Sequence, residues 1–272
     1  MNVIEGLNIQ GFVLDTRVNY NSIPGLKGWR DARYRITLET GVNSWGDFSP
    51  EGNTFSQSTD LRQPAWIDNY KVRSVPNAIA AQVDFLRSPR RDYTFLHNRT
   101  GRWGYYFIAI PQVPNASTTV LSWQVLSTCE FNAGQHGIVI TIQDNATAGN
   151  CAIQYRTRNG GVETGSGNSN VIVGGNNALG SFGIFYKAIA TGGNIFYYNN
   201  SIHRTQNTTI TDGTDNEHDY FHLSKSSSTG GGELMFELLY DWTGYSQAEA
   251  EAFDLLVRTQ LELTKAEFAL LP

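Results

Sequence analysis

The sequence predicts an all-β sandwich that ends in one α-helix, and three observations carry this prediction. Short apolar runs alternate with clusters of Gly, Asn, Ser and Thr, which is typical of strands joined by turns. Good helix formers are sparse before Ser246. Ser246 and Glu249 then have the spacing of a capping box, which marks the start of a helix. With 272 residues, 40% of them hydrophobic, the chain can bury one large core.

The expected elements follow in chain order. Residues 1–24 are expected to form an extended arm or first strand, and residues 25–272 the sandwich with its C-terminal helix at residues 246–268. Apolar runs predict strands at residues 78–86, 104–110, 118–128, 136–143, 151–158, 182–190, 194–199, 220–223 and 230–241. Loops are expected at residues 144–150 and 191–193, and the glycine-rich residues 160–180 are expected to be a connection. One apolar face of the helix is expected to contain Phe253, Leu256, Val257 and Leu261.

Several motifs resemble the concanavalin A-like, laminin-G-type jelly roll. Trp45, Asp47, Ser49 and Asn53 are similar to the family's Trp-x-Asp-x-Ser-Gly-x-Gly-Asn element, although Pro50 and Glu51 replace its first glycine region. Further similar segments are residues 63–67, 194–201 and 245–249. The resemblance spans residues 25–263 and implies a concanavalin A-like jelly-roll β-sandwich with a capped C-terminal α-helix. It implies little about function, because the fold hosts lectins, hydrolases, adhesion modules and viral structural domains.

Charge and hydropathy limit the classes of partner. The net charge of −5 gives no indication of bulk attraction to nucleic acid or to an anionic membrane. The chain has no apolar run of about 18 residues that would predict a transmembrane helix, and its start lacks the pattern of a secretory signal. A surface-type sandwich without an export signal favours a virion protein, which is made in the cytoplasm and reaches the outside after lysis.

Two cysteines, Cys129 and Cys151, leave two interpretations open. They can lie on neighbouring strands as a disulfide, or remain a reduced and buried pair. Neither cysteine has a second Cys or His at ligand spacing, so a zinc site is not predicted.

An acidic segment, residues 212–219, is the candidate for metal binding or catalysis. On a strand, Asp215, Glu217 and Asp219 would share one face, and glycoside hydrolysis needs such a carboxylate pair. Some jelly-roll hydrolases carry Glu-x-Asp-x-Glu, whereas this chain has Asp-x-Glu-x-Asp. Asp212, Asp215, Glu217 and Asp219 also offer the hard oxygen ligands that calcium prefers. A solvated acidic loop before the strand at 220–223 is the third interpretation.

Other catalytic patterns are missing from the sequence. No Gly-x-Ser-x-Gly elbow occurs, and the five histidines are scattered. Residues 230–232 are three glycines, but they do not follow a strand and open a helix as a phosphate loop does. The sequence therefore favours a binding or structural role without a resident cofactor, calcium excepted.

An arginine-rich segment is the candidate for partner or glycan binding. It contains Arg87, Arg90, Arg91, Arg99 and Arg102. Arginine forks bind carboxylates, and Tyr93 and its aromatic neighbours would add stacking surface. One alternative is nucleic-acid binding, against which the acidic net charge argues. The other is a solvated loop whose aromatic residues enter the core, as is also expected of Trp29, Trp45, Trp66 and Trp123.

These observations predict a non-enzymatic structural protein on the virion of a tailed bacteriophage. Its expected place is a head decoration or fibre, the collar or the tail. Its expected partners are other virion proteins, a host-surface glycan, and further copies of itself, without nucleic acid or membrane insertion. The alternatives are a cellular carbohydrate-binding lectin or adhesion module, and a glycan hydrolase that uses Glu217 with Asp215 or Asp219.

Overall fold

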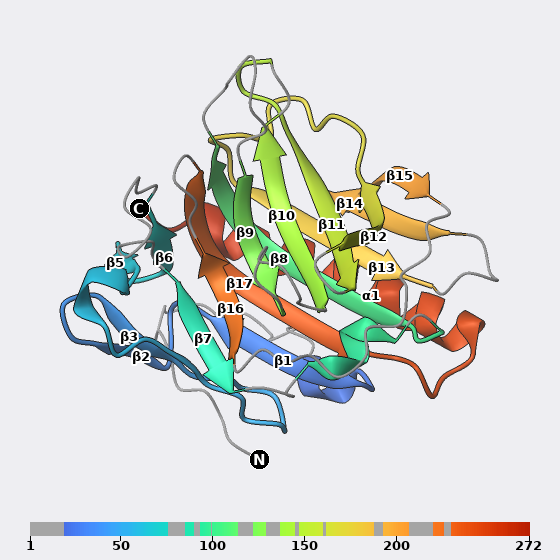
Figure 1. Cartoon of the computed structure of the whole chain (residues 1–272), viewed down its shortest axis with the longest axis horizontal. Helices are drawn as coiled ribbons and strands as arrows, with labels where there is room; N and C mark the ends of the chain where they lie inside the picture. The colour runs from blue at the N-terminus through green and yellow to red at the C-terminus, as the bar shows by residue number, and fades with distance from the viewer. Residues whose placement is uncertain are drawn as a thin grey trace, which may run out of the picture.

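The computed structural model describes most of the chain, with gaps between the described ranges. These ranges are 19–75, 85–89, 93–98, 100–113, 122–128, 137–144, 147–159, 162–187, 193–206, 220–225 and 230–272. They form two facing antiparallel sheets and a C-terminal helix, which confirms the predicted all-β, jelly-roll-like sandwich (Figure 1). Of the predicted N-terminal arm, residues 19–24 are described, and they contain the short 3-10 turn η1 (Tyr20–Ser22).

The first sheet lies between the second sheet and the helix. Among the described residues its order is β15-β14-β13-β8-β17-β6-β5, with β1 also paired to β17. The bounds of these strands are β1 (Leu26–Asp31), β5 (Ala65–Ile67), β6 (Lys71–Ser74), β8 (Trp103–Gln112), β13 (Gly180–Tyr186), β14 (Asn194–Tyr198), β15 (Ser201–Gln206) and β17 (Gly231–Asp241). The central pair β8 and β17 runs antiparallel from Gln112 opposite Gly231 to Trp103 opposite Asp241, with a register shift between Leu234 and Phe236.

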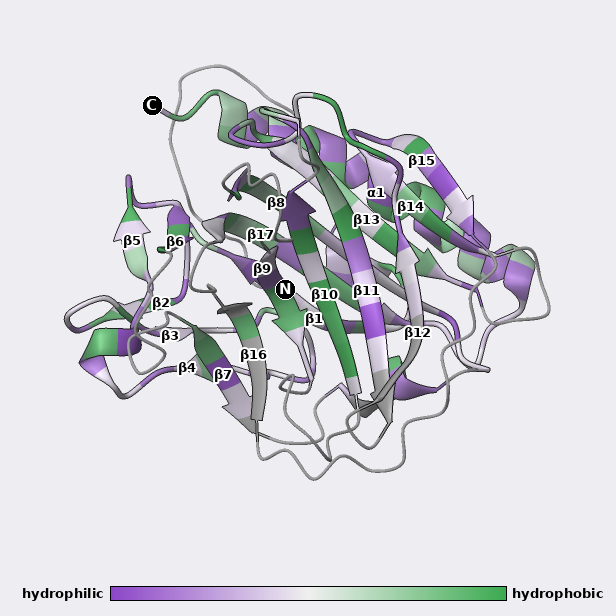
Figure 2. Ribbon diagram, turned by 45° about the horizontal axis from the view of Figure 1, so that its top comes forward, coloured by the Kyte–Doolittle hydropathy of each residue, from purple (hydrophilic) through white to green (hydrophobic). Residues whose placement is uncertain are grey.

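The second sheet has the described order β12-β11-β10-β9-β16-β7-β4-β3-β2. Its strands are β2 (Ile36–Leu38), β3 (Val42–Trp45), β4 (Phe55–Ser56), β7 (Leu86–Pro89), β9 (Ser122–Ser127), β10 (Gly137–Asp144), β11 (Cys151–Asn159), β12 (Val162–Asn168) and β16 (Tyr220–Lys225). Two further 3-10 turns are η2 (Asp60–Arg62) and η4 (Thr94–His97). Figure 2 shows the contrast between the largely hydrophobic β10 and the hydrophilic edge strand β15.

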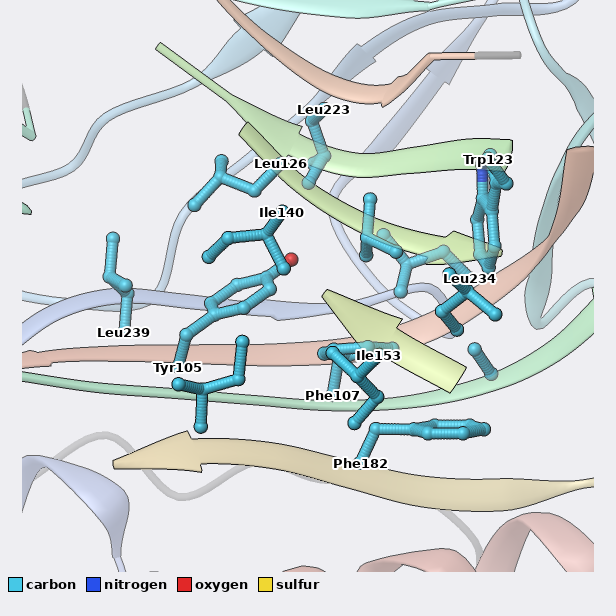
Figure 3. Close-up of a cluster of buried hydrophobic side chains, with 14 of the residues drawn as sticks. Tyr105, Phe107, Trp123, Leu126, Ile140, Ile153, Phe182, Leu223, Leu234 and Leu239 are labelled. Atoms are coloured by element: carbon cyan, nitrogen blue, oxygen red, sulfur yellow. The ribbon is translucent and has the colours of Figure 1, made fainter. Parts of the chain in front are cut away.

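One apolar layer fills the space between the sheets. Tyr105 and Phe107 of β8 point from the first sheet toward Ile140 and Ile153 of the second, and all four side chains are fully buried (Figure 3). Trp123 closes the same layer from β9. Because strand side chains alternate between faces, these strands also send residues such as Tyr106 and Ile108 to the opposite side, where a second apolar layer forms.

Helix α1 (Gln247–Ala269) covers that second layer. Ser246 caps it as predicted: the Ser246 hydroxyl accepts from the backbone N of Glu249 at 3.3 Å, and the Glu249 carboxylate accepts from the backbone N of Ser246 at 2.8 Å. Val257 and Leu261 face the sheet and are buried, whereas Leu256 is 50% exposed. The sequence-based placement of Leu256 on the buried face is therefore wrong. No helix in the described ranges has the length and apolar character needed to cross a membrane.

A buried carboxylate anchors the helix to the sheet. Asp254 accepts hydrogen bonds from the hydroxyl of Tyr106 at 2.6 Å, from that of Tyr197 at 2.7 Å and from Arg258 Nε at 3.1 Å. Burial raises the pKa of Asp254, although Arg258 and the two hydroxyls oppose the shift. Near the other end of the helix, the Tyr20 and Thr264 hydroxyls lie 2.7 Å apart.

Most predicted strands are confirmed, but strands β1 to β6 and β15 lie in segments for which no strand was predicted, and two further segments differ. The glycine-rich connection expected at 160–180 contains strand β12, and the arginine-bearing loop expected at 87–89 belongs to strand β7. Residues 76–84, which cover most of the strand predicted at 78–86, lie outside the described ranges. So do residues 118–121, the start of the strand predicted at 118–128.

Candidate functional site

The structure places the described members of the arginine-rich segment in three different settings. Arg87 lies within the second sheet, opposite Ser56 of β4 and His222 of β16. Arg102 donates from Nη1 to the backbone oxygen of Tyr245 at 3.2 Å, which ties it to the linker before the helix. Tyr93 is fully buried, so its predicted role as a surface for stacking a partner is wrong. Arg90, Arg91 and Arg99 lie outside the described residues.

The predicted calcium or catalytic residues Asp212, Asp215, Glu217 and Asp219 also lie outside the described residues. Within the described ranges, no group of three or more His, Cys, Asp or Glu side chains is placed to hold a metal ion. Cys151 is a free, buried thiol whose pKa burial raises to about 12, and Cys129 lies outside the described residues.

Asp47, from the motif that resembles the jelly-roll family, organises a loop against β1. One carboxylate oxygen accepts from the backbone N of Trp29 and from that of Ser49, both at 2.8 Å. The other accepts from the Ser49 hydroxyl at 2.7 Å and from the backbone N of Asn53 at 3.1 Å. The backbone N of Phe48 donates in turn to the Trp29 oxygen at 2.8 Å. Four donors bind the nearly buried Asp47 carboxylate, so the loop around it has one conformation. This conformation holds Phe48 beside Trp29.

A tight turn between β1 and β2 brings two further side chains to this loop. Asp31 accepts from the backbone N of Arg33 at 3.0 Å, and its own backbone oxygen accepts from the backbone N of Tyr34. Arg35 then adopts φ +55°, the left-handed region that non-glycine residues rarely occupy. A Cβ at Gly46 would lie 3.0 Å from the Arg35 Cβ, so the glycine lets the two segments approach closely. The Arg35 guanidinium donates to the Asp47 backbone oxygen.

The result is a partly exposed aromatic cluster, which we define as Trp29, Tyr34 and Phe48 with Arg35 on its surface. The ring centroids of Trp29 and Phe48 lie 5.3 Å apart, and those of Tyr34 and Phe48 lie 6.3 Å apart in an edge-to-face arrangement. The Arg35 guanidinium carbon lies 4.1 Å from the Phe48 ring centroid, a cation–π contact. The three rings are partly exposed and Arg35 is exposed.

The cluster rests on a rigid base. On its inner side Trp29 packs edge-on against Tyr20, with centroids 5.4 Å apart, and Tyr20 continues into the layer beneath the helix. Arg33 bonds to Asp31 and, at 2.9 Å, to Glu267 near the end of α1. Burial lowers the pKa of the Arg33 guanidinium, but these two carboxylates outweigh burial and leave the pKa raised. Arg33 is thus a fixed cation that joins the turn to the helix.

This arrangement has the chemistry of a glycan-binding surface. Aromatic rings pack against the apolar C–H face of a sugar, and an exposed guanidinium offers paired donors to a carboxylate. The cluster has no nucleophile or carboxylate aimed at a common point, since Asp47 is saturated by its own loop.

Sequence reasoning missed this cluster, although it named parts of it. Trp45 and Trp123 are core residues as expected, whereas Trp29 lies at the surface of the helix-side layer. The motif around Asp47 was the sequence signal that could have indicated the cluster. Phe48 lies between Asp47 and Ser49 of this loop-forming motif, which holds it in a defined orientation. The contact of Phe48 with Trp29 and Tyr34 joins three segments, so no local pattern reveals it.

Comparison with solved structures finds the same fold in bacterial toxin binding domains. The binding domain of Paraclostridial Mosquitocidal Protein 1 has a TM-score of 0.52 and 11% identity, over 84% of this chain and 51% of that one. The botulinum neurotoxin serotype D binding domain has a TM-score of 0.53 and 12% identity, over 88% and 53%. The binding domain of botulinum neurotoxin DC in complex with SialylT has a TM-score of 0.52 and 9% identity, over 87% and 52%.

These similarities concern the fold alone, because the identities are 9–12%. The chain spans about half the length of the solved structures it matches. No protein-family model matches the sequence, and no curated protein sequence matches it.

Proposed function

We propose that this protein is a non-enzymatic, lectin-like module that binds an anionic glycan at the aromatic cluster. The observation that carries the proposal is the partly exposed set of Trp29, Tyr34 and Phe48 with the Arg35 guanidinium 4.1 Å from the Phe48 ring. Rings supply the stacking surface for a sugar, and the guanidinium selects a ring that carries a carboxylate.

Pre-organisation supports a binding role for Arg35. Its φ of +55° costs of order 1–3 kcal/mol, and such strain persists where surrounding contacts hold it. A side chain that is held in place before the ligand arrives loses less entropy on binding, which raises affinity. The net charge of −5 sharpens selectivity, since an anionic ligand must find a local positive site on an acidic protein.

The comparisons give secondary support. One neighbour of the same fold was solved in complex with SialylT, and the others are described as binding domains. A shared fold makes a binding role reasonable for this chain, but the choice of ligand rests on the chemistry of its own cluster.

Binding to an array of neutral and carboxylate-bearing glycans tests the proposal. The parent should bind carboxylate-bearing members, and Arg35→Asn should weaken that binding by about 10- to 100-fold. This range corresponds to losing a charged hydrogen bond worth about 1.5–3 kcal/mol. Asn tolerates the left-handed backbone at residue 35, so the variant removes the guanidinium without refolding the turn.

Arg87→Asn is the matched control, because it removes an arginine of the segment first predicted from the sequence. Its glycan binding should equal that of the parent. Loss of binding in Arg87→Asn with normal binding in Arg35→Asn would move the site to the arginine-rich segment. A parent that binds no anionic glycan would refute the lectin proposal.

The virion location is a separate part of the proposal and rests on the sequence alone. A phage particle protein and a cellular lectin would both bind a glycan, so binding does not separate them. Mass spectrometry of purified phage particles separates the two, since a head, collar or tail component must be present in them. The hydrolase alternative has its own test: a Glu217→Gln variant should release as little reducing sugar from a polysaccharide as the parent does.

A further inference from the structure

Helix α1 has a second apolar face that the described part of the sandwich leaves exposed. On one side of the helix, between its capped first turn and its last residue Ala269, the exposed positions are Ala252, Leu255, Leu256, Thr259, Leu263 and Ala266, followed by Leu270 just beyond the helix. We call these seven residues the outward stripe. Leu255 is 54% exposed, Leu256 50%, Leu263 49% and Leu270 87%. Apart from the neighbours Leu255 and Leu256, steps of three or four residues place them along one side, as in the contact face of a paired helix.

The charges of the helix do not interrupt this stripe. Glu251 pairs with Lys187 at 2.7 Å and Glu267 pairs with Arg33 at 2.9 Å, so both carboxylates point toward the body of the protein. Arg258 bonds to the buried Asp254 at 3.1 Å, and Lys265 pairs with Glu262 at 2.5 Å. A surface helix ordinarily places charged residues opposite its buried face, and a helix that is apolar on both faces is expected to be covered.

Thr259 is the single polar residue of the stripe, and burying it costs no hydrogen bond. Its hydroxyl donates to the backbone oxygen of Leu255, four residues earlier, at 2.8 Å. A covered stripe would therefore leave no unsatisfied donor at its centre.

Five of the seven stripe residues are arranged symmetrically about Thr259, whereas Leu256 and Leu270 have no counterpart in the stripe. Ala252 and Ala266 stand seven residues before and after it, and Leu255 and Leu263 stand four before and after it. Two helices packed antiparallel around a two-fold axis at Thr259 would set Ala252 beside Ala266 and Leu255 beside Leu263 of the other copy. A two-fold interface uses the same patch on both subunits, which this symmetry satisfies.

We propose that the outward stripe is a homodimer interface, in which α1 packs antiparallel against α1 of a second copy. The size of the stripe sets the strength of this contact. A helix of 23 residues is about 34 Å long, so a stripe about 10 Å wide covers roughly 340 Å². The area of one stripe is within the range of functional apolar patches. The total area buried by the two stripes of a dimer is below the roughly 1,200 Å² of most stable interfaces. The dimer should therefore be reversible and concentration-dependent.

Sedimentation velocity over a range of protein concentrations tests the proposal. The parent should shift from monomer toward dimer as the concentration rises, and the double variant Leu255→Glu/Leu263→Glu should stay monomeric. Leu61→Glu is the matched control, because Leu61 is 67% exposed but lies outside the helix. It should dimerise like the parent. Unchanged melting temperatures for all variants would show that the fold is intact.

Oxidative cross-linking tests the orientation. Thr259→Cys should form a disulfide-linked dimer, whereas Ala252→Cys should not, because an antiparallel pair separates the two copies of residue 252 by about 21 Å along the axis. Efficient cross-linking of both variants would indicate a parallel pair and overturn the antiparallel arrangement. A parent that is monomeric at every concentration would overturn the dimer. Neither outcome bears on glycan binding by the aromatic cluster.

Discussion

A buried ionic group shows how single residues tie neighbouring loops to the first sheet. Arg30 of β1 is fully buried, bonds to Glu237 of β17 and donates to the Tyr93 hydroxyl at 2.5 Å. Asp47 lies 3.6 Å away, and Tyr105 donates to Glu237 at 3.1 Å. Burial raises the pKa of Glu237, and Arg30 opposes that shift. The same arginine therefore favours the ionised form of the carboxylate against burial, and it lies against the Asp47 loop, on which the aromatic cluster depends.

Replacing Arg30 by Met should lower the free energy of unfolding by about 3–5 kcal/mol at pH 7, because it leaves Glu237 buried without its cation. The pKa of Glu237 would rise further in this variant. A group with a raised folded-state pKa stabilises below its ordinary value, near 4.5, and loses that contribution as pH rises through the folded-state pKa. The deficit should therefore shrink as pH falls toward 4 in urea unfolding experiments.

Lys27→Met is the control for that experiment. Lys27 and its partner Glu51 form a solvent-accessible ion pair at 2.7 Å. Its loss should cost within about 1 kcal/mol. A deficit in Arg30→Met that stays constant or grows at acid pH would contradict the role assigned to Glu237.

Among the secondary-structure elements, the sequence best predicts those whose hydrophobic period and capping residues lie close together in the chain. Helix α1 begins at Gln247 after Ser246, within one residue of the prediction, because the capping box lies within four residues. Strand β12 was missed since its glycines look like a loop. The structure explains Gly167: a Cβ there would lie 2.6 Å from the Tyr155 ring of the neighbouring strand. That requirement comes from a residue twelve positions away, which no local pattern contains.

Docking of α1 should depend more on Asp254 than on the cap. Asp254→Ala leaves two buried tyrosine hydroxyls and Arg258 without their shared acceptor, which should cost about 3 kcal/mol. Ser246→Ala should cost about 1 kcal/mol. Thermal unfolding and hydrogen exchange of the helix amides measure both effects. An Asp254→Ala variant that is no less stable than Ser246→Ala would show that the apolar contacts alone hold the helix.

For the whole molecule, the sequence could predict the sandwich. It could not predict which residues of the apolar layer between the first sheet and α1 are exposed. Periodicity assigns a residue to a face, and neighbouring elements then decide whether that face is covered. Leu256 was expected to be buried and Trp29 was expected in the core, and each position depends on how α1 and β1 lie on the first sheet. The candidate site is likewise an assembly of three segments, which explains why only its Asp47 anchor was visible beforehand.

Dimerisation through α1 would place two aromatic clusters on each dimer. Linking two sites turns the second binding event into an intramolecular one and can raise avidity by about 10²- to 10⁴-fold. The Leu255→Glu/Leu263→Glu variant should therefore bind a dense carboxylate-bearing glycan surface at least about tenfold more weakly than the parent. Its affinity for the free glycan in solution should be unchanged, because the cluster at Trp29 and Arg35 is intact. Surface plasmon resonance at high and low glycan density measures the first quantity, and calorimetry the second. Equal binding of variant and parent to the dense surface would show that the two clusters do not act together.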